Sequence, residues 1–166
     1  GAAAQVAREN GYEVEILGDS IEGEASEVAR QHAQRALAAK HSGRRVAILS
    51  GGELTVTING SGHGGPNQEY ALALALALGG EPGITAVAGD TDGTDGGSGA
   101  ADDPAGALVL KDSLTRAVAA NLNPASMLAD NDSTTFFDRI DGLVRTGPTQ
   151  TNVNDFRAIL IDGTTA

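Results

Sequence analysis

PNQEYALALALAL, residues 66–78, is the stretch of sequence that decides the fold. Its leucines stand at alternate positions, as in a strand, but every residue from Ala71 to Leu78 is Ala or Leu, and neither type is β-branched. Both are among the best helix formers. Pro66 stands where a first helical residue is favoured, and Gly79 follows as a stop signal. The segment therefore predicts a helix that is apolar on all sides and buried between layers.

Short apolar runs and helix-forming stretches alternate around this segment. Strands are expected at 12–17, 46–49, 54–58, 84–88 and 156–161, and helices at 1–10, 24–40, 112–122, 124–130 and 133–140. This alternation predicts an α/β fold, a three-layer sandwich around a sheet that is mainly parallel, with a mixed sheet as the alternative. A boundary near Ser42 divides a strand-helix segment, 1–42, from an α/β domain, 43–166.

Charge and composition exclude several classes of function. The chain has 166 residues, a net charge of −11, two lysines and no cysteine. Nucleic acid is not expected as a partner, because phosphate neutralisation needs clustered Lys and Arg. Without cysteine there is no disulfide or thiolate zinc site. The longest apolar run, 70–78, is far shorter than the ~20 residues that span a bilayer, and the first residues lack signal-peptide features. We expect no membrane contact and a cytoplasmic location.

Four polar segments are candidates for a ligand site. Three are rich in glycine, at 50–53, 60–65 and 89–97, and the fourth is 146–155. Ligands of open α/β sheets bind where loops leave the carboxyl ends of strands. We therefore expect these segments to converge on one rim and line one pocket, with the N-terminus of the 66–78 helix facing it. The residues expected to line it are Gly52, Gly64, Asp92 and Asn152.

The second segment contains G-x-G-x-x-G at Gly60, Gly62 and Gly65. Following a strand and preceding a helix, it fits a dinucleotide-binding turn, but also a simple flexible connection. A Walker A motif is absent. His63, in the same turn, is a candidate hydrogen-bond donor to a phosphate or a general base. The alternative is a surface histidine without a role. His32 and His41 are expected on solvated helix surfaces.

The third segment carries three closely spaced carboxylates, Asp90, Asp92 and Asp95. Mg²⁺ prefers a few carboxylates together with phosphate oxygens and water. The segment is therefore a candidate Mg²⁺ site. The alternative is a solvated acidic turn.

Taken together, the segments resemble a known family in order and spacing. The motifs are SGGE followed by TVT at 50–57, GG-x-NQE at 64–69, TDG-x-DG at 91–96 and TGPT-x-TNVND at 146–155. Supporting stretches are IEGEA at 21–25 and 128–137. This set resembles the MOFRL domain, the C-terminal domain of glycerate 2-kinases, which are often named hydroxypyruvate reductases.

The resemblance implies ATP- and Mg²⁺-dependent transfer of phosphate to the 2-hydroxyl of D-glycerate or a related 2-hydroxy acid. Its implied site is a cleft to an N-terminal kinase domain that this chain lacks, so the isolated chain is expected to be inactive. Implied catalytic residues are Asp92, Asp95 and His63, and implied metal ligands are Asp90, Asp92 and Asp95. Implied substrate- or phosphate-binding residues are Ser50, Gly51, Gly52, Glu53, Gly62, Gly64, Gly65, Asn67, Gln68, Glu69, Thr91, Thr149, Thr151, Asn152 and Asn154.

One departure from the family and two other functions bear on this interpretation. Pro66 stands where the family often has Arg, so any role of that Arg toward a carboxylate or phosphate is lost or moved to another residue. An NAD(P)-dependent hydroxypyruvate reductase would fit the glycine pattern at 60–65. A non-enzymatic ligand-binding module would fit the missing partner domain.

Overall fold

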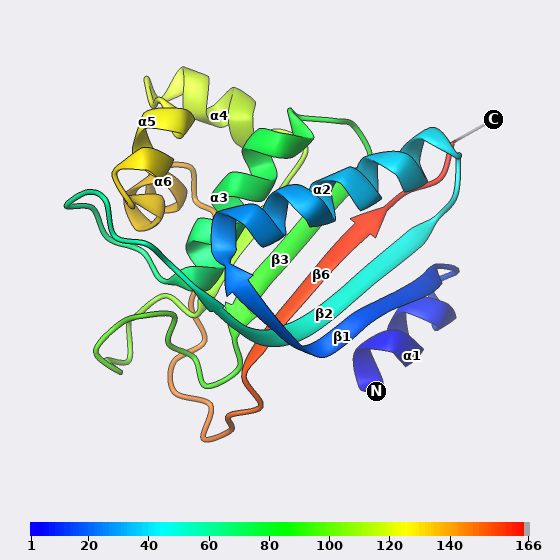
Figure 1. The fold of residues 1–166 in the computed structure, drawn as a ribbon, viewed down its shortest axis with the longest axis horizontal. Coiled ribbons are helices and arrows are strands. Elements are labelled where there is room, and N and C mark those ends of the chain that lie inside the picture. The colour runs from blue at the N-terminus through cyan, green and yellow to red at the C-terminus, as the bar shows by residue number, and fades with distance from the viewer. Residues whose placement is uncertain (165–166) are drawn as a thin grey trace.

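The computed structural model describes residues 1–164 and contains six helices and six strands in that range (Figure 1). The helices are α1 (Ala2–Glu9), α2 (Ala25–His41), α3 (Pro66–Leu78), α4 (Ser113–Ala119), α5 (Pro124–Ala129) and α6 (Ser133–Arg139). The strands are β1 (Glu13–Glu24), β2 (Val46–Thr55), β3 (Ile84–Asp90), β4 (Gly106–Val109), β5 (Leu143–Val144) and β6 (Asp155–Ile161). The fold class is α/β, as predicted.

The strands form one mixed sheet in the order β1-β2-β6-β3-β4-β5. Only β1 and β2 are parallel, and the other neighbouring pairs are antiparallel. The prediction of a mainly parallel sheet was therefore wrong. A parallel neighbour needs a crossover connection, but β3 leads to β4 through a loop without a helix, and the short strands β4 and β5 went unpredicted. The C-terminal strand β6 then enters between β2 and β3 in the antiparallel sense.

β2 is one continuous strand, although the sequence predicted two with a turn at the glycines between them. Gly52 lies within the strand at φ +120°, a conformation that side chains rarely adopt. A Cβ at this position would overlap the backbone N and O atoms of Ile21 in β1. The register between β1 and β2 shifts on either side of Gly18. Gly52 therefore lets an irregular β1 approach β2 closely, and it does not turn the chain.

α3 is the buried centre of the molecule, as predicted. Pro66 occupies the first turn, and Gly79 ends the helix in a left-handed conformation at φ 61°. Its leucines and alanines join one hydrophobic cluster with α2, the sheet and the helices α4 to α6. Residues 1–42 contribute β1 and α2 to this same sheet and cluster, so the core extends across the boundary predicted near Ser42.

The two faces of the sheet differ in how they are covered. α2 and α3 cross one face (Figure 1), where Ile48, Ile159 and Ile161 are buried in the main cluster. On the other face α1 packs on β1 and β2, whereas Phe156 on β6 is 37% exposed. The complete three-layer sandwich that the sequence predicted is not formed by the described residues. Within residues 1–164, no helix is long and apolar enough to cross a membrane.

The close approach at Gly52 predicts a large stability loss for Gly52→Ala. The new Cβ meets backbone atoms of Ile21, which cannot rotate away as a side chain would. We expect the free energy of unfolding to fall by about 4 kcal/mol or more, the range of exceptional substitutions. Gly80→Ala is the matched control, because Gly80 also has positive φ but has open space around it, so it should lose only about 1–3 kcal/mol of backbone strain. Equal losses in urea denaturation would contradict the packing role of Gly52.

Candidate functional site

The predicted loops converge at one end of the sheet. Gly52 of β2 pairs with Asp155 of β6, which pairs in turn with Asp90 of β3. The loops that follow β3 and precede β6 are tied together, because the backbone N–H and the hydroxyl of Thr91 both donate to the carbonyl of Asn154, at 3.2 and 2.7 Å. The expectation of one shared rim is confirmed for these segments.

The loop 146–155 also contacts the acidic segment directly. The N–H of Thr149 donates to the carbonyl of Asp92 at 3.2 Å. The Thr149 hydroxyl donates to the carbonyl of Thr91 and accepts the N–H of Thr151 at 3.3 Å. The side-chain oxygen of Asn152 accepts the N–H of Asn154 at 3.0 Å. These residues hold the shape of the rim, and their side chains are exposed.

Asp90 and Asp92 form a close carboxylate pair on this rim. Asp90 Oδ1 accepts the N–H of Asp92 at 3.1 Å, and Asp92 Oδ1 accepts the N–H of Thr94 at 2.8 Å. Burial and the charges of Asp92 and Asp155 raise the pKa of Asp90 to about 6, against the opposing effect of the Asp92 N–H. Crowded carboxylates of this kind favour a bound proton or a cation.

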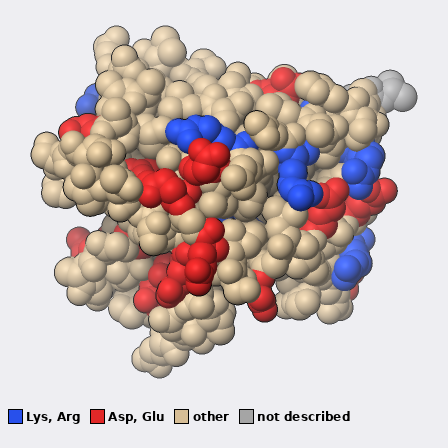
Figure 2. Space-filling view, viewed as in Figure 1, with Lys and Arg blue, Asp and Glu red and all other residues tan. Residues whose placement is uncertain are grey.

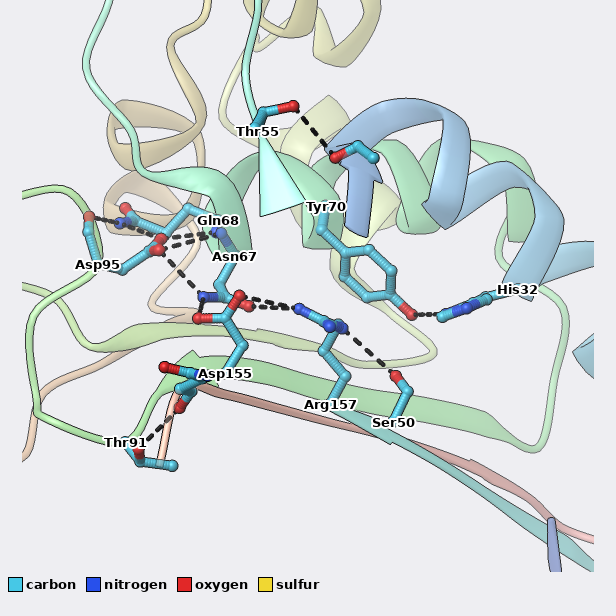
Figure 3. Close-up of polar contacts among 12 residues, drawn as sticks. His32, Ser50, Thr55, Asn67, Gln68, Tyr70, Thr91, Asp95, Asp155 and Arg157 are labelled. Carbon is cyan, nitrogen blue, oxygen red and sulfur yellow. Dashed lines mark hydrogen bonds and ion pairs between the residues drawn. The ribbon is translucent and has the colours of Figure 1, made fainter. Parts of the chain in front are cut away.

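Asp95 does not join that pair. It is buried, and its two oxygens accept the backbone N–H groups of Asn67 at 3.0 Å and Gln68 at 2.8 Å. The side-chain amides of the same two residues also donate to it, at 3.2 and 2.9 Å (Figure 3). Burial raises the pKa of Asp95, and these four donors oppose the rise. In residues 1–164, no group of three carboxylates or histidines is placed to hold a metal.

The N-terminus of α3 therefore already holds an anion, the carboxylate of Asp95. The sequence predicted that the free N–H groups of this helix would face a phosphate pocket. The helix does begin at the rim, since the Asn67 side chain donates to Asp155 at 2.8 Å. Its first amides, however, are engaged by the protein itself, which leaves them unavailable to a phosphate unless Asp95 moves.

A buried network continues from Asn67 into the space between α3 and the sheet (Figure 3). Arg157 is fully buried, and its Nη1 donates to Asp155 at 3.1 Å and to Asn67 at 3.3 Å. Its Nε donates to Ser50 at 3.3 Å. Nη2 is buried without a hydrogen-bond partner among the described residues. The network joins the start of α3 to β2 and β6.

Sequence reasoning missed Arg157, and it misplaced His32. The guanidinium of Arg157 lies over the ring of Tyr70, 5.5 Å from its centroid, and the Tyr70 hydroxyl is 2.7 Å from His32 Nδ1. His32 is buried, although it was expected on a solvated helix surface. The period-2 pattern of β6 could have found Arg157, because that residue shares its face with Ile159 and Ile161.

The glycine turn at 60–65 packs against the segment before α6. Gly60 and Gly62 approach Asp130 and Asp132 so closely that a Cβ would overlap them. The N–H of Gly60 donates to Asn131 at 2.9 Å, and the N–H of His63 donates to Asp132 at 3.1 Å. The glycines of this turn therefore permit close packing, and at least these two amides are already engaged. The His63 side chain is exposed.

Glu53 and Glu69 differ in their surroundings. Glu53 is exposed on β2. Glu69 is buried and accepts the Asn131 amide at 2.8 Å, and it lines a cavity of about 250 Å³ together with Glu24. Burial and the charge of Glu24 raise the pKa of Glu69, against its hydrogen bond from Asn131. Figure 2 shows Asp and Glu side chains gathered near the middle of the face in view, with Lys and Arg side chains above them and to the right. An anionic phosphate would need a cation to approach such a surface.

A cavity of about 420 Å³ opens beside the rim, but its lining is mainly apolar. Leu49, Phe156 and the first turn of α1 line it, and Gly51 and Thr91 border it. Gly64, Asp92 and Asn152 are not in its lining. The expected single pocket shared by all four segments is therefore not formed by this cavity.

Comparison with known proteins identifies a family and several similar proteins. The MOFRL family profile matches residues 46–155. A protein of Agrobacterium vitis provisionally named hydroxypyruvate reductase is 52% identical over 96% of this chain and 37% of its own length. The D-glycerate 2-kinase of Thermotoga maritima is 38% identical over 92% of this chain and 37% of its own length.

Solved structures agree with these sequence matches. The crystal structure of a glycerate kinase from Thermotoga maritima has a TM-score of 0.89 and 37% identity, over 96% of this chain and 38% of that one. A protein of Pyrococcus horikoshii OT3 has the same TM-score and 32% identity, over 98% of this chain and 37% of that one. The chain thus spans well under half the length of these relatives.

The cap on α3 predicts a marked loss of stability for Asp95→Ala. Four donors, two of them backbone amides, would lose their acceptor in a buried position. Each buried unsatisfied group costs about 1–3 kcal/mol, so we expect a loss of about 3 kcal/mol or more in urea denaturation. Asp103→Ala is the control, since Asp103 also accepts backbone N–H groups but in an exposed turn. A loss no larger than the control's would remove the capping role.

The buried His32 predicts a pH dependence of stability. Burial, followed by the charges of Arg157 and Arg35, lowers the pKa of His32 from 6.5 to about 4. The unfolded chain binds a proton below pH 6.5 and the folded chain only near pH 4, so stability falls as the pH drops through this window. His32→Gln should remove that part of the slope, whereas His41→Gln, at an exposed helix end, should retain it. Identical slopes in both variants would contradict a buried neutral His32.

Proposed function

This chain belongs to the MOFRL family, and from that premise we propose that it forms part of a glycerate kinase. The reaction would transfer the terminal phosphate of ATP to the hydroxyl of D-glycerate or a related 2-hydroxy acid. The observation that carries this proposal is the rim where Asp90 and Asp92 lie together beside the loop 146–155. The glycerate kinases among the relatives support it.

The rim has the chemistry of a partial Mg²⁺ site. Asp90 and Asp92 would hold the ion, because Mg²⁺ takes one or two carboxylates and completes its shell with phosphate oxygens and water. Burial, and after it the charges of Asp92 and Asp155, raise the pKa of Asp90. A cation bound between Asp90 and Asp92 would relieve the part that comes from neighbouring charge. The bound ion would neutralise charge on the phosphate that is transferred. Asp95 is better assigned to positioning, since it fixes the start of α3.

The remaining rim residues would orient the reactants. Thr91, Thr149 and Asn154 keep the two loops in contact and so hold Asp92 in place. His63 has an exposed ring while its backbone is engaged, which leaves the ring free to accept the proton of the substrate hydroxyl. An acidic surface needs further cationic groups against the phosphates, and we assign these to an N-terminal kinase domain that closes over the rim.

The second name among the relatives, hydroxypyruvate reductase, would require a nicotinamide site. The G-x-G-x-x-G pattern was the main argument for such a site. Its first two glycines instead meet Asp130 and Asp132, and Gly65 meets Asp95. A close approach to a pyrophosphate is therefore not needed to explain the pattern. This packing favours the kinase over the reductase.

Asp92→Asn in the full-length protein should lower kcat by about 100-fold or more. A loss of this size is typical when an enzyme loses one group that stabilises charge in the transition state. The amide keeps the oxygen that accepts the Thr94 N–H, so the thermal midpoint should stay nearly unchanged. A coupled ADP-release assay with D-glycerate measures turnover. Asp103→Asn is the matched control and should keep normal kcat. Residues 1–166 alone should show no turnover.

A normal kcat for Asp92→Asn at saturating Mg²⁺ would contradict the metal assignment and restore the view of a solvated acidic turn. Turnover of NADH with hydroxypyruvate, without turnover of ATP with D-glycerate, would contradict the kinase proposal itself.

A further inference from the structure

The sheet has an apolar strip on the face away from α2 and α3. Alternate residues of β6, β3 and β4 point to this side, since their neighbours along each strand are buried in the main cluster. Among the seven residues of this strip, Thr85 has the one polar side chain. We call it the open face; it consists of Thr85, Val87, Leu108, Leu110, Phe156, Ala158 and Leu160.

Three cavities adjoin one another along this open face, and we call them together the groove. The largest, about 460 Å³, lies between α1 and β6. It shares Leu49 and Phe156 with the 420 Å³ cavity beside the rim. It shares Ala158 and Leu160 with a cavity of about 190 Å³ over β3 and β4. The groove therefore runs from α1 to the β4 side of the sheet.

The exposed hydrophobic side chains of the protein concentrate in this groove. Of eight large hydrophobic residues that are exposed within the described chain, six line its cavities. They are Val6, Ile16, Leu108, Leu110, Val153 and Phe156. Single exposed apolar residues are ordinary, but a contiguous apolar patch marks an interaction surface.

The dimensions of the groove fit one α-helix. Three neighbouring strands, β6, β3 and β4, lie beyond the part that α1 covers. Strands are about 4.8 Å apart, so three strands span about 10 Å, the diameter of a helix with its side chains. β6 has seven residues and is about 23 Å long, which matches a helix of about 15 residues. A helix here would lie beside α1 and complete a second helical layer.

We propose that an amphipathic helix from the same polypeptide, outside residues 1–166, docks on the open face. The relatives that this chain matches are more than twice its length, since it covers 37–42% of the first two. A segment tethered in the same molecule would dock at a high effective concentration. Weak contacts, such as those of the small side chain of Ala158, would therefore suffice to hold it. The proposal concerns a sheet face and does not depend on the function assigned to the rim.

Thiol labelling of the full-length protein tests this docking. Residues 1–166 contain no cysteine, so Leu108→Cys is the one thiol within these residues, and its labelling is followed on the peptide that contains position 108. Val118→Cys is the control, because Val118 is exposed on α4 away from the groove. In the structure of residues 1–164 alone, Leu108 is 37% and Val118 73% exposed, which predicts rates within a few-fold if nothing covers the face. We expect Leu108→Cys to react at least about 100-fold more slowly than Val118→Cys. Leu110→Cys is a second reporter should Leu108→Cys fail to fold.

A photoreactive group attached to the Leu108→Cys thiol identifies the occupant. Crosslinks to a peptide outside residues 1–166, unchanged on dilution, are the expected result. Labelling of Leu108→Cys within a few-fold of Val118→Cys would overturn the proposal. Crosslinks to residues 1–166 with protection that fades on dilution would identify a second copy, and crosslinks to another polypeptide would identify a separate partner; either would overturn it.

Discussion

The contact between Asp95 and the start of α3 is the constraint on which the rest of the structure depends. α3 is apolar on nearly every side, so it must be buried along its length. A buried helix cannot leave its first N–H groups to water, and they need an acceptor from the protein. Asp95 supplies that acceptor, and so the acidic loop after β3 must lie against the helix N-terminus. The position of the rim follows from this requirement.

A buried charge imposes a second constraint, between α3 and the sheet. Arg157 lies in the core, where an unpaired guanidinium would be strongly unfavourable. Asp155 neutralises it, and Asn67 and Ser50 accept its other hydrogen bonds. These partners come from α3, β2 and β6, so the network joins the helix layer to the sheet at the end where the rim forms. Asp155 also contributes charge to the surroundings of Asp90, which connects the core network to the candidate metal ligands.

The glycines serve two different purposes in this fold. Gly52 and the glycines at 60–65 remove side chains where two backbone segments meet. Gly79 instead provides the left-handed conformation that ends α3. Neither use requires a ligand. The chemistry that we propose for the rim therefore rests on its carboxylates, and the glycines allow the supporting loops to approach one another.

The sequence by itself determined the fold class, the central helix and the family. Helix propensity, Pro66 and Gly79 act locally, so 66–78 could be recognised without any tertiary information, and the motif order was specific enough to indicate the MOFRL family. Only the tertiary structure decided the strand directions, the separation of Asp95 from Asp90 and Asp92, and the burial of Arg157 and His32. These depend on which distant segments pair. The sequence does not distinguish a loop carboxylate that faces water from one that binds a metal or a helix N-terminus. For Asp95 the role is decided by its partner Asn67, which is 28 residues away in the sequence.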